Sequence, residues 1–203
     1  KDNGAILLFS SQPFTTDLII SNRKMFKYEI IWKKTTKTGF FNAKKAPLRA
    51  HENILVFYKK QPTYNPIKFP QKSAQIGRKR KNSDYKKCSG NSWGKVSKNS
   101  AANYTYIDDG LRYPTDIIEF GNWNGALFGN NQNATKHPAQ KPVSLLEYLI
   151  KTYTNDGDLV LDNCMGSGST GVAAQNLNRD FIGIELNENY FEIANKRINE
   201  TKT

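Results

Sequence analysis

The stretch Asp158-Leu-Val-Leu-Asp-Asn-Cys-Met-Gly-Ser-Gly-Ser-Thr-Gly171, near the end of the chain, decides the fold. Its apolar run at 159–161 is typical of a buried strand, and three glycines at the GxGxxG spacing follow at once. Residues 172–177 then predict a helix, and Phe181-Ile-Gly-Ile184 predicts a second buried strand that ends at Glu185. The order is strand, glycine turn, helix, strand and acid.

This order has the physical logic of a nucleotide-type site. Glycines let the backbone turn sharply, and a helix N-terminus offers N–H groups and the positive end of a dipole. A carboxylate about 20 residues further on can bind both hydroxyls of a ribose, and Glu185 stands at that spacing from Gly166. The glycine spacing alone is a weak signal, so a turn without a ligand stays open. A complete dinucleotide fold is disfavoured, because we expect no second nucleotide-binding half after Glu185.

Charge is unevenly spread along the 203 residues, which carry a formal net charge of +12. Residues 1–60 and 61–141 are each strongly basic, at +8, whereas residues 142–203 carry −4. Solubilising surfaces usually mix their signs, so the basic two thirds indicate a polyanionic partner. The length allows one domain with an elaboration.

The two cysteines, Cys88 and Cys164, provide neither a disulfide framework nor a metal cluster. This usage fits a reducing compartment, and we expect a cytoplasmic protein without a bound metal. No apolar run approaches the ~20 residues that span a bilayer, so no membrane partner is expected.

Hydrophobic patterns predict an α/β protein with a largely parallel sheet. Strands are predicted over 5–9, 26–32, 54–58, 159–161 and 181–184, with short β-like pieces near 104–107 and 116–120. Helices are predicted over 15–21, 143–153, 172–177 and from about 188 onward. Residues 33–45 are expected to form a basic loop, and 61–136 an irregular basic insert.

Together these pieces resemble the β group of DNA amino-methyltransferases. The resemblance rests on His137-Pro-Ala-Gln-Lys-Pro142, on the glycine stretch and on Phe181-Ile-Gly-Ile-Glu185. It extends to Gly4–Phe14 and Arg49–Tyr58 and leaves only the insert unmatched. It implies a class I methyltransferase-like (Rossmann-like), mostly parallel sheet. The implied domains are an incomplete catalytic-side half over 1–60, a target-recognition insert over 61–136, and a cofactor half over 137–203.

The resemblance implies S-adenosylmethionine as the cofactor. Glu185 would bind the ribose hydroxyls, while Ser167, Thr170 and the helix N-terminus would meet the cofactor carboxylate. A rigid helix entry is the competing explanation for His137-Pro-Ala-Gln-Lys-Pro142, since proline favours the first helical turn. The implied cofactor residues are Asp162, Cys164, Gly166, Ser167, Gly168, Thr170, Glu185, His137, Gln140 and Lys141.

One part of the family pattern is missing. Methyl transfer to an exocyclic amine uses an Asp/Asn/Ser-Pro-Pro-Tyr/Phe motif, and the chain contains no Pro-Pro pair. Ser11-Gln12-Pro13-Phe14 is superficially similar, but it follows a strand that matches the one after the catalytic strand. We therefore expect no catalytic residue in this chain. Instead, roughly 60–100 residues with two strands and the motif are expected upstream of Lys1.

Double-stranded DNA is the implied partner, and its target base must be flipped out of the helix. Any single lysine is well explained as a solvated surface charge, so the argument rests on clustering. Asn42, His51 and Glu52 are expected near the opening left by the base. The predicted DNA-binding residues are Lys33, Lys34, Lys44, Lys45, Arg49, Arg78, Lys79, Arg80, Lys86 and Lys87.

The leading hypothesis that the resemblance implies is a site-specific DNA methyltransferase of bacterial or phage type, acting on the N6 amine of adenine. Cytosine-N4 methylation is the nearest alternative within this class. The choice between the two bases would depend on the missing motif. A catalytically inert DNA-binding specificity or regulatory module with a vestigial cofactor site stays open, and a nicotinamide-dependent oxidoreductase is disfavoured by the basic insert. A homodimer and a cognate restriction endonuclease are both conceivable partners.

Overall fold

The computed structural model describes residues 2–70, 76–81, 105–122 and 140–201, in two compact units. One unit contains Lys1–Asn65 together with Thr115–Thr203, and the other contains Pro66–Pro114. The boundaries of the target-recognition insert, expected at residues 61 and 136, stay a prediction. Within the described ranges, no helix combines the length and the apolar character needed to cross a membrane.

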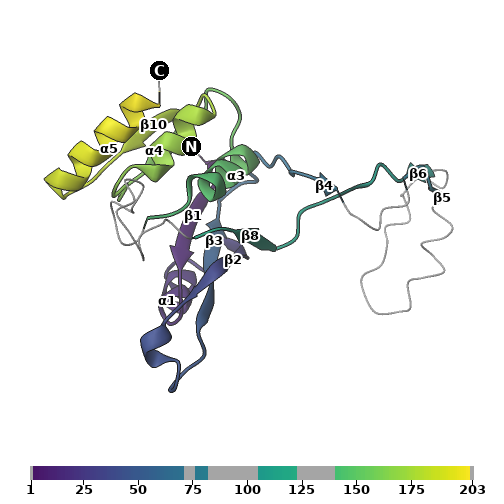
Figure 1. The fold of residues 1–203 in the computed structure, drawn as a ribbon. Coiled ribbons are helices and arrows are strands. Elements are labelled where there is room, and N and C mark those ends of the chain that lie inside the picture. Colours follow the sequence, from purple (N-terminus) through teal and green to yellow (C-terminus); the bar gives the residue numbers. More distant parts are fainter. Residues whose placement is uncertain (1, 71–75, 82–104, 123–139, 202–203) are drawn as a thin grey trace. The chain divides into compact units, whose positions relative to one another are not determined.

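A four-stranded sheet forms one part of the first unit (Figure 1). Its strand order is β1 (Ile6–Ser10), β3 (Arg49–Phe57), β2 (Phe26–Thr38) and β8 (Ile117–Phe120). β3 runs antiparallel to both of its neighbours, and β8 runs parallel to β2. α1 (Phe14–Ser21) follows β1, with the Thr15 hydroxyl donating to Ser10 Oγ over 2.9 Å.

A parallel strand pair forms the other part of this unit. β9 (Leu159–Asp162) pairs with β10 (Asp180–Gly183), and α4 (Ser169–Asn176) connects them. α5 (Glu188–Glu200) follows β10, and the Asn187 side chain caps it by accepting from the Tyr190 amide. This strand–helix–strand unit is the one predicted from the glycine stretch.

α3 (Val143–Tyr153) joins the two parts through its apolar faces. Leu145, Leu149 and Tyr153 pack with Trp32 and Ile54 of the four-stranded sheet. On another side of the helix, Leu146 and Ile150 pack against Ala173 and Ala174 of α4, with Val160 and Phe181 beside them. The hydrophobic spacing that predicted this helix therefore serves two cores at once.

One face of the β9–β10 pair remains open in the described structure. Leu159, Leu161, Ile182 and Ile184 are 53%, 62%, 48% and 55% exposed, respectively. The side chains between them, including Val160 and Phe181, face α3 and α4. Parallel sheets are normally covered on both faces, so four half-exposed apolar side chains on one short strand pair are unusual.

The mixed α/β architecture confirms the predicted fold class, but the predicted loop at 33–45 is wrong over its first half. β2 continues to Thr38, with Lys33 opposite His51 and Thr38 opposite Arg49. A short 3₁₀ turn, η1 (Phe40–Asn42), then closes the hairpin. Main-chain pairing with β3 extends the strand through residues whose side chains show no apolar alternation.

Two small antiparallel strand pairs are found among the described residues of the second unit. β4 (Phe69–Pro70) pairs with β7 (Leu111–Arg112), and β5 (Lys79–Lys81) pairs with β6 (Thr105–Ile107). The buried Asp108 binds Arg112 through two 2.8 Å contacts and also accepts from the Gly110 amide at 2.9 Å. A charge-assisted pair of this kind holds the turn between β6 and β7 in place.

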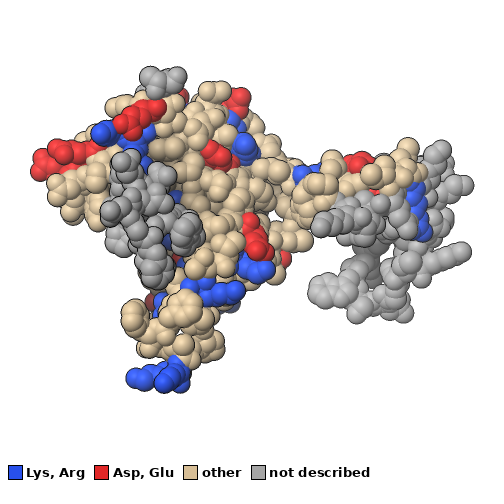
Figure 2. All heavy atoms as spheres, in the orientation of Figure 1, with Lys and Arg blue, Asp and Glu red and all other residues tan. Residues whose placement is uncertain are grey.

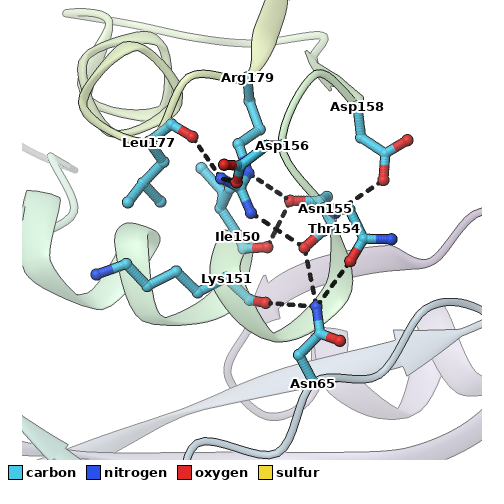
Figure 3. A network of polar contacts seen from close by, with 9 residues as sticks. All are labelled: Asn65, Ile150, Lys151, Thr154, Asn155, Asp156, Asp158, Leu177 and Arg179. Carbon is cyan, nitrogen blue, oxygen red and sulfur yellow. Dashed lines mark hydrogen bonds and ion pairs between the residues drawn. The ribbon is translucent and has the colours of Figure 1, made fainter.

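A polar network fastens the C-terminal end of α3 within the first unit (Figure 3). The Asn65 side-chain amide donates to the carbonyls of Lys151 and Thr154 at 3.2 and 3.1 Å. The guanidinium of Arg179 donates to the Thr154 hydroxyl and carbonyl and forms an ion pair with Asp156. These donors satisfy carbonyl groups that the end of a helix leaves without partners.

Candidate functional site

The turn after β9 is closed by hydrogen bonds of its own residues. Asp162 Oδ2 accepts from the Thr170 hydroxyl at 2.6 Å, and Asp162 Oδ1 accepts from the Cys164 amide at 3.1 Å. One carboxylate thereby joins the start of the loop to the first turn of α4. This loop, residues 163–168, is called the glycine loop below.

Glu185 lies at the carboxyl end of β10 and is held against the glycine loop. Its Oε2 accepts from the Gly166 amide at 2.8 Å, and its Oε1 accepts from the Asn187 amide at 2.9 Å. The two backbone donors fix the position of both carboxylate oxygens. The acid predicted from sequence spacing therefore faces the turn that precedes it by 19 residues.

Two glycines of the motif are required by close packing against α5. Gly168 has φ +78°, and a Cβ there would lie 2.8 Å from the Cβ and 2.9 Å from the Cα of Ala194. A Cβ at Gly171 would lie 2.3 Å from Cδ1 of Ile198. These positions let α5 approach the loop and the N-terminus of α4 from behind.

Ser167 is fully buried and joins three segments of the chain. Its hydroxyl donates to Gln140 Oε1 at 2.8 Å, and Arg197 of α5 donates to the same hydroxyl oxygen at 3.0 Å and to the Ser167 carbonyl. Burial lowers the pKa of the Arg197 guanidinium. Sequence patterns did not reveal Arg197, because nothing local to α5 marks a contact made across the fold.

Lys141, predicted to border the same pocket, points its ammonium group at Glu52. Lys141 Nζ lies 2.8 Å from Glu52 Oε2, and the buried Lys34 lies 2.5 Å from Glu52 Oε1. Both ammonium groups also lie over the ring of Trp32, at 5.8 and 5.4 Å from its centroid. We call Lys34, Glu52 and Lys141 the lysine–glutamate cluster.

Opposing effects act on the Glu52 carboxyl. Burial would raise its pKa, but hydrogen bonds and charges from Lys141 and Lys34 outweigh burial and hold the pKa below its ordinary value. Glu52 is therefore ionised at neutral pH. The cluster carries two cations against one anion, which leaves one positive charge in excess at this point.

The lysine–glutamate cluster and the glycine loop lie at the same edge of the fold. Gln140, which contacts Ser167 of the loop, is adjacent in sequence to Lys141, which contacts Glu52 of β3. Lys141 Nζ also lies 5.0 Å from the ring centroid of Phe9, near the carboxyl end of β1. Ligands of α/β folds bind at the carboxyl ends of the strands, and the antiparallel β3 brings its amino half, with Glu52, beside the carboxyl end of β1.

Cys164 is an exposed free thiol in the glycine loop. Partial burial and the carboxylates of Asp162 and Glu185 raise its pKa. The thiol therefore stays protonated at neutral pH and is a poor nucleophile. This environment suits a contact residue and does not support a role in covalent catalysis.

Most of the predicted cofactor residues therefore meet around one turn. The residues brought together are Asp162, Cys164, Gly166, Ser167, Gly168, Thr170, Glu185 and Gln140, with Lys141 one residue beyond. His137 lies outside the described residues. Across the described ranges, no group of three or more His, Cys, Asp or Glu side chains could hold a metal ion.

The predicted DNA-binding residues occupy different environments. Lys33 forms an exposed 2.8 Å pair with Glu119, whereas Lys34 belongs to the lysine–glutamate cluster. Lys44, Lys45 and Arg49 are exposed around the β2–β3 turn, and Arg78 is exposed in the second unit. β5 includes Lys79 and Arg80, whose side chains are not described, and Lys86 and Lys87 fall outside the described residues.

Comparisons with known proteins agree with this geometry. The chain is 45% identical over 82 residues to the type II methyltransferase M2.LlaDCHI of Lactococcus lactis subsp. cremoris, a match covering 40% of this chain and 30% of the relative. It is 48% identical over 83 residues to the type II methyltransferase M2.DpnII of Streptococcus pneumoniae, covering 39% and 31%. The matches thus span about a third of the relatives' lengths.

Structural similarity extends over nearly the whole chain. The crystal structure of the M1.HpyAVI-SAM complex superposes with a TM-score of 0.59 and 28% identity, covering 98% of this chain and 76% of that chain. The family model described as DNA methylase, of the N6/N4 methyltransferase type, matches residues 1–196. The chain belongs to this N6/N4 DNA methylase family.

Proposed function

We propose that this chain is the cofactor-binding and DNA-binding part of a site-specific adenine-N6 DNA methyltransferase. The observation that carries the proposal is the Glu185 carboxylate, fixed against the Gly166 amide at the carboxyl end of a parallel strand pair. A carboxylate in this place suits the hydroxyls of an adenosyl ribose. M1.HpyAVI, a structural neighbour, was crystallised with SAM.

The residues of the glycine loop fit S-adenosylmethionine as a cofactor. Glu185 would bind the ribose, while the N-terminal turn of α4 would face the carboxylate of the methionine part. The cofactor supplies an activated methyl group, so the protein contributes position and electrostatics. Asp162, Arg197 and Gln140 hold the loop in shape through the bonds described above.

The Pro-Pro-aromatic motif is proposed to come from polypeptide upstream of Lys1. The open apolar face formed by Leu159, Leu161, Ile182 and Ile184 supports this proposal, because parallel strands are normally covered on both faces. Such a segment would supply both the cover and the motif. Without it, the chain is expected to bind its ligands and to transfer no methyl group.

Cofactor titration tests the proposal directly. Calorimetric titration with S-adenosylmethionine is expected to show one site, and Glu185→Ala should weaken binding about 30-fold, because bonds to a charged group are lost. Glu188→Ala, in the first turn of α5, is the matched control and should bind normally. Equal affinity of the two variants, or binding of a nicotinamide cofactor instead, would refute the assignment.

Methyl transfer is tested with the native reading frame, extended upstream to include the motif. Radiolabelled methyl groups are expected to enter duplex DNA, and nucleoside analysis should find N6-methyladenine. N4-methylcytosine would establish the alternative target base. DNA binding without cofactor binding would instead support a regulatory or specificity module.

The partners follow from the same proposal. Double-stranded DNA is the substrate, and the target base would be flipped out because its amine is buried in the stacked duplex. A cognate endonuclease is proposed because the similar proteins M2.LlaDCHI and M2.DpnII are named type II methyltransferases. A homodimer is a further expectation, which sedimentation of the extended protein would test.

A further inference from the structure

The β2–β3 hairpin continues beyond the end of β1 (Figure 1). β1 ends at Ser10, opposite Asn53, whereas β3 starts four residues earlier, at Arg49. At the rise of a β-strand, four residues extend the hairpin by about 13 Å. Its tip, residues 39–48, therefore lies well beyond the last paired residue of β1.

Two aromatic side chains sit at this tip without burial. Phe40 is 66% exposed and Phe41 is fully exposed, on the short turn η1. Single exposed apolar residues are common, but two adjacent phenylalanines on a protruding turn form a small exposed apolar patch, which is called the apolar point below. Neither packs against another ring in the described structure.

Cations surround this apolar point. No acidic residue occurs between positions 33 and 49, and Figure 2 shows Lys and Arg atoms at the end of the projection. In the described part of the chain, no carboxylate lies within ion-pair distance of the exposed residues Lys37, Lys44, Lys45 and Arg49. Unneutralised cations beside exposed aromatic rings match a polyanion that also carries stacking surfaces.

The hairpin also starts from the edge that carries the proposed cofactor site. Glu52 of β3 contacts Lys141, and the neighbouring Gln140 contacts Ser167 of the glycine loop. DNA bound with its target base at the glycine loop would therefore extend along the side from which the hairpin projects. The tip therefore lies on the side of the fold along which such a duplex would extend.

We propose that Phe40 and Phe41 form a wedge that inserts between base pairs, with Lys37, Lys44 and Lys45 holding the flanking phosphates. The proposal rests on the DNA-binding function proposed above. Apolar wedges unstack base steps and kink the duplex, and a base beside an unstacked step leaves the helix more readily. The basic residues supply affinity and the rings supply the local distortion.

The test compares two fluorescein-labelled duplexes of one mixed sequence, one fully paired and one with a single central mismatch. A wedge prefers the mismatched duplex, because that step is already weakly stacked. Phe40→Ala/Phe41→Ala is expected to lose about tenfold in affinity for the mismatched duplex and to bind both probes equally, since stacked rings are removed. Its salt dependence should match that of the unmodified chain.

Two control variants separate the rings from the charges. Lys44→Ala/Lys45→Ala should weaken binding to both duplexes alike and reduce the salt slope by about two, one per phosphate contact. Phe191→Ala, an exposed phenylalanine of the acidic helix α5, should leave both affinities unchanged. Circular dichroism establishes that each variant is folded.

Three outcomes would overturn the wedge. Unchanged discrimination between the duplexes in the phenylalanine variant rejects it while leaving the DNA-binding function in place. A change from dimer to monomer in sedimentation, with unchanged DNA affinity, assigns the rings to a subunit contact. Absence of DNA binding by the unmodified chain refutes both the wedge and the DNA-binding function.

Discussion

The glycine loop and the tip of the β2–β3 hairpin, the two regions proposed to bind ligands, are built in opposite ways. In and beside the loop, Asp162, Ser167 and Glu185 each bond to neighbouring backbone or side chains. At the tip, Lys44 and Lys45 have no ion-pair partner among the described residues, and Phe41 is fully exposed. The residues around the loop are held by bonds within the chain, whereas the side chains at the tip remain exposed, as the two proposals require.

Of the substitutions that test this comparison, the one at Gly168 should have the largest effect on the free energy of unfolding. Gly168→Ala is expected to lower the free energy of unfolding by about 3 to 4 kcal/mol, because the positive φ and the 2.8 Å contact with Ala194 act together. Urea denaturation measures the change. Gly157→Ala is the matched control, since Gly157 has φ +76° but open space around its Cβ, and should cost about 1 kcal/mol. Equal losses would show that packing behind the loop contributes nothing.

Glu52→Gln comes next, because it leaves the lysine–glutamate cluster without its anion. We expect a loss of about 2 kcal/mol, below that of a fully buried pair broken from one side, because Glu52 is only partly buried. Glu119→Gln, which breaks the exposed pair with Lys33, should cost less than about 1 kcal/mol. If both variants unfold at the same urea concentration, the contact of Glu52 with Lys34 and Lys141 does not stabilise the fold more than an exposed ion pair does.

The same cluster predicts an acid dependence. The pKa of Glu52 is lowered in the folded chain, so its contribution is present above the ordinary pKa of a glutamic acid. This contribution is lost as the pH falls through the folded pKa. The stability difference between the unmodified chain and Glu52→Gln should therefore shrink on acidification, and thermal melts at decreasing pH would detect it. A constant difference would contradict the assignment.

A kinetic measurement sharpens the contrast at Cys164. Because burial and two carboxylates raise its pKa, alkylation by iodoacetamide should be slower than that of a free thiol at neutral pH and should accelerate as the pH rises. S-adenosylhomocysteine should slow it further if the cofactor covers the loop. The Cys88→Ser background isolates the signal. Alkylation at the rate of a free thiol, unaffected by ligand, would place the cofactor elsewhere.

The smallest effect is expected at the hairpin tip. Lys44→Ala, Lys45→Ala and Phe41→Ala should each change the unfolding free energy by less than about 0.5 kcal/mol, because these side chains make no described packing or ion-pair contact. Thermal denaturation provides the measurement. A loss of 2 kcal/mol or more (about the cost of a core change) would show that the tip is a structural element.

Local pattern predicted much of the fold. The apolar spacing of Val143–Tyr153 fixed both ends of α3, and the glycine spacing identified the turn that Glu185 faces. The pattern did not predict the extension of β2 to Thr38, because pairing with β8 and with β3 determines it and the side chains of Lys33–Thr38 do not alternate. Local pattern cannot report a hydrogen-bond ladder between strands.

The polar organisation of the site was less accessible for a similar reason. Lys34, Glu52 and Lys141 meet across more than one hundred residues of sequence, and Arg197 reaches Ser167 from the last helix. Each residue alone resembles a surface charge. Only the packing of β3, α3 and α5 makes them partners, and no residue type or spacing within a single element encodes it.

The hydrogen bonds of Asn65 to the C-terminal end of α3 have a practical consequence for the design of chimeric proteins. Asn65 is the last residue of the first unit before Pro66, and its side chain bonds to the carbonyls of Lys151 and Thr154. A chimera with junctions after Asn65 and before Thr115 exchanges the whole second unit and keeps these hydrogen bonds intact. A junction a few residues before Asn65 would replace Asn65 by a residue of the donor protein. The donor would then have to supply an asparagine at the equivalent position.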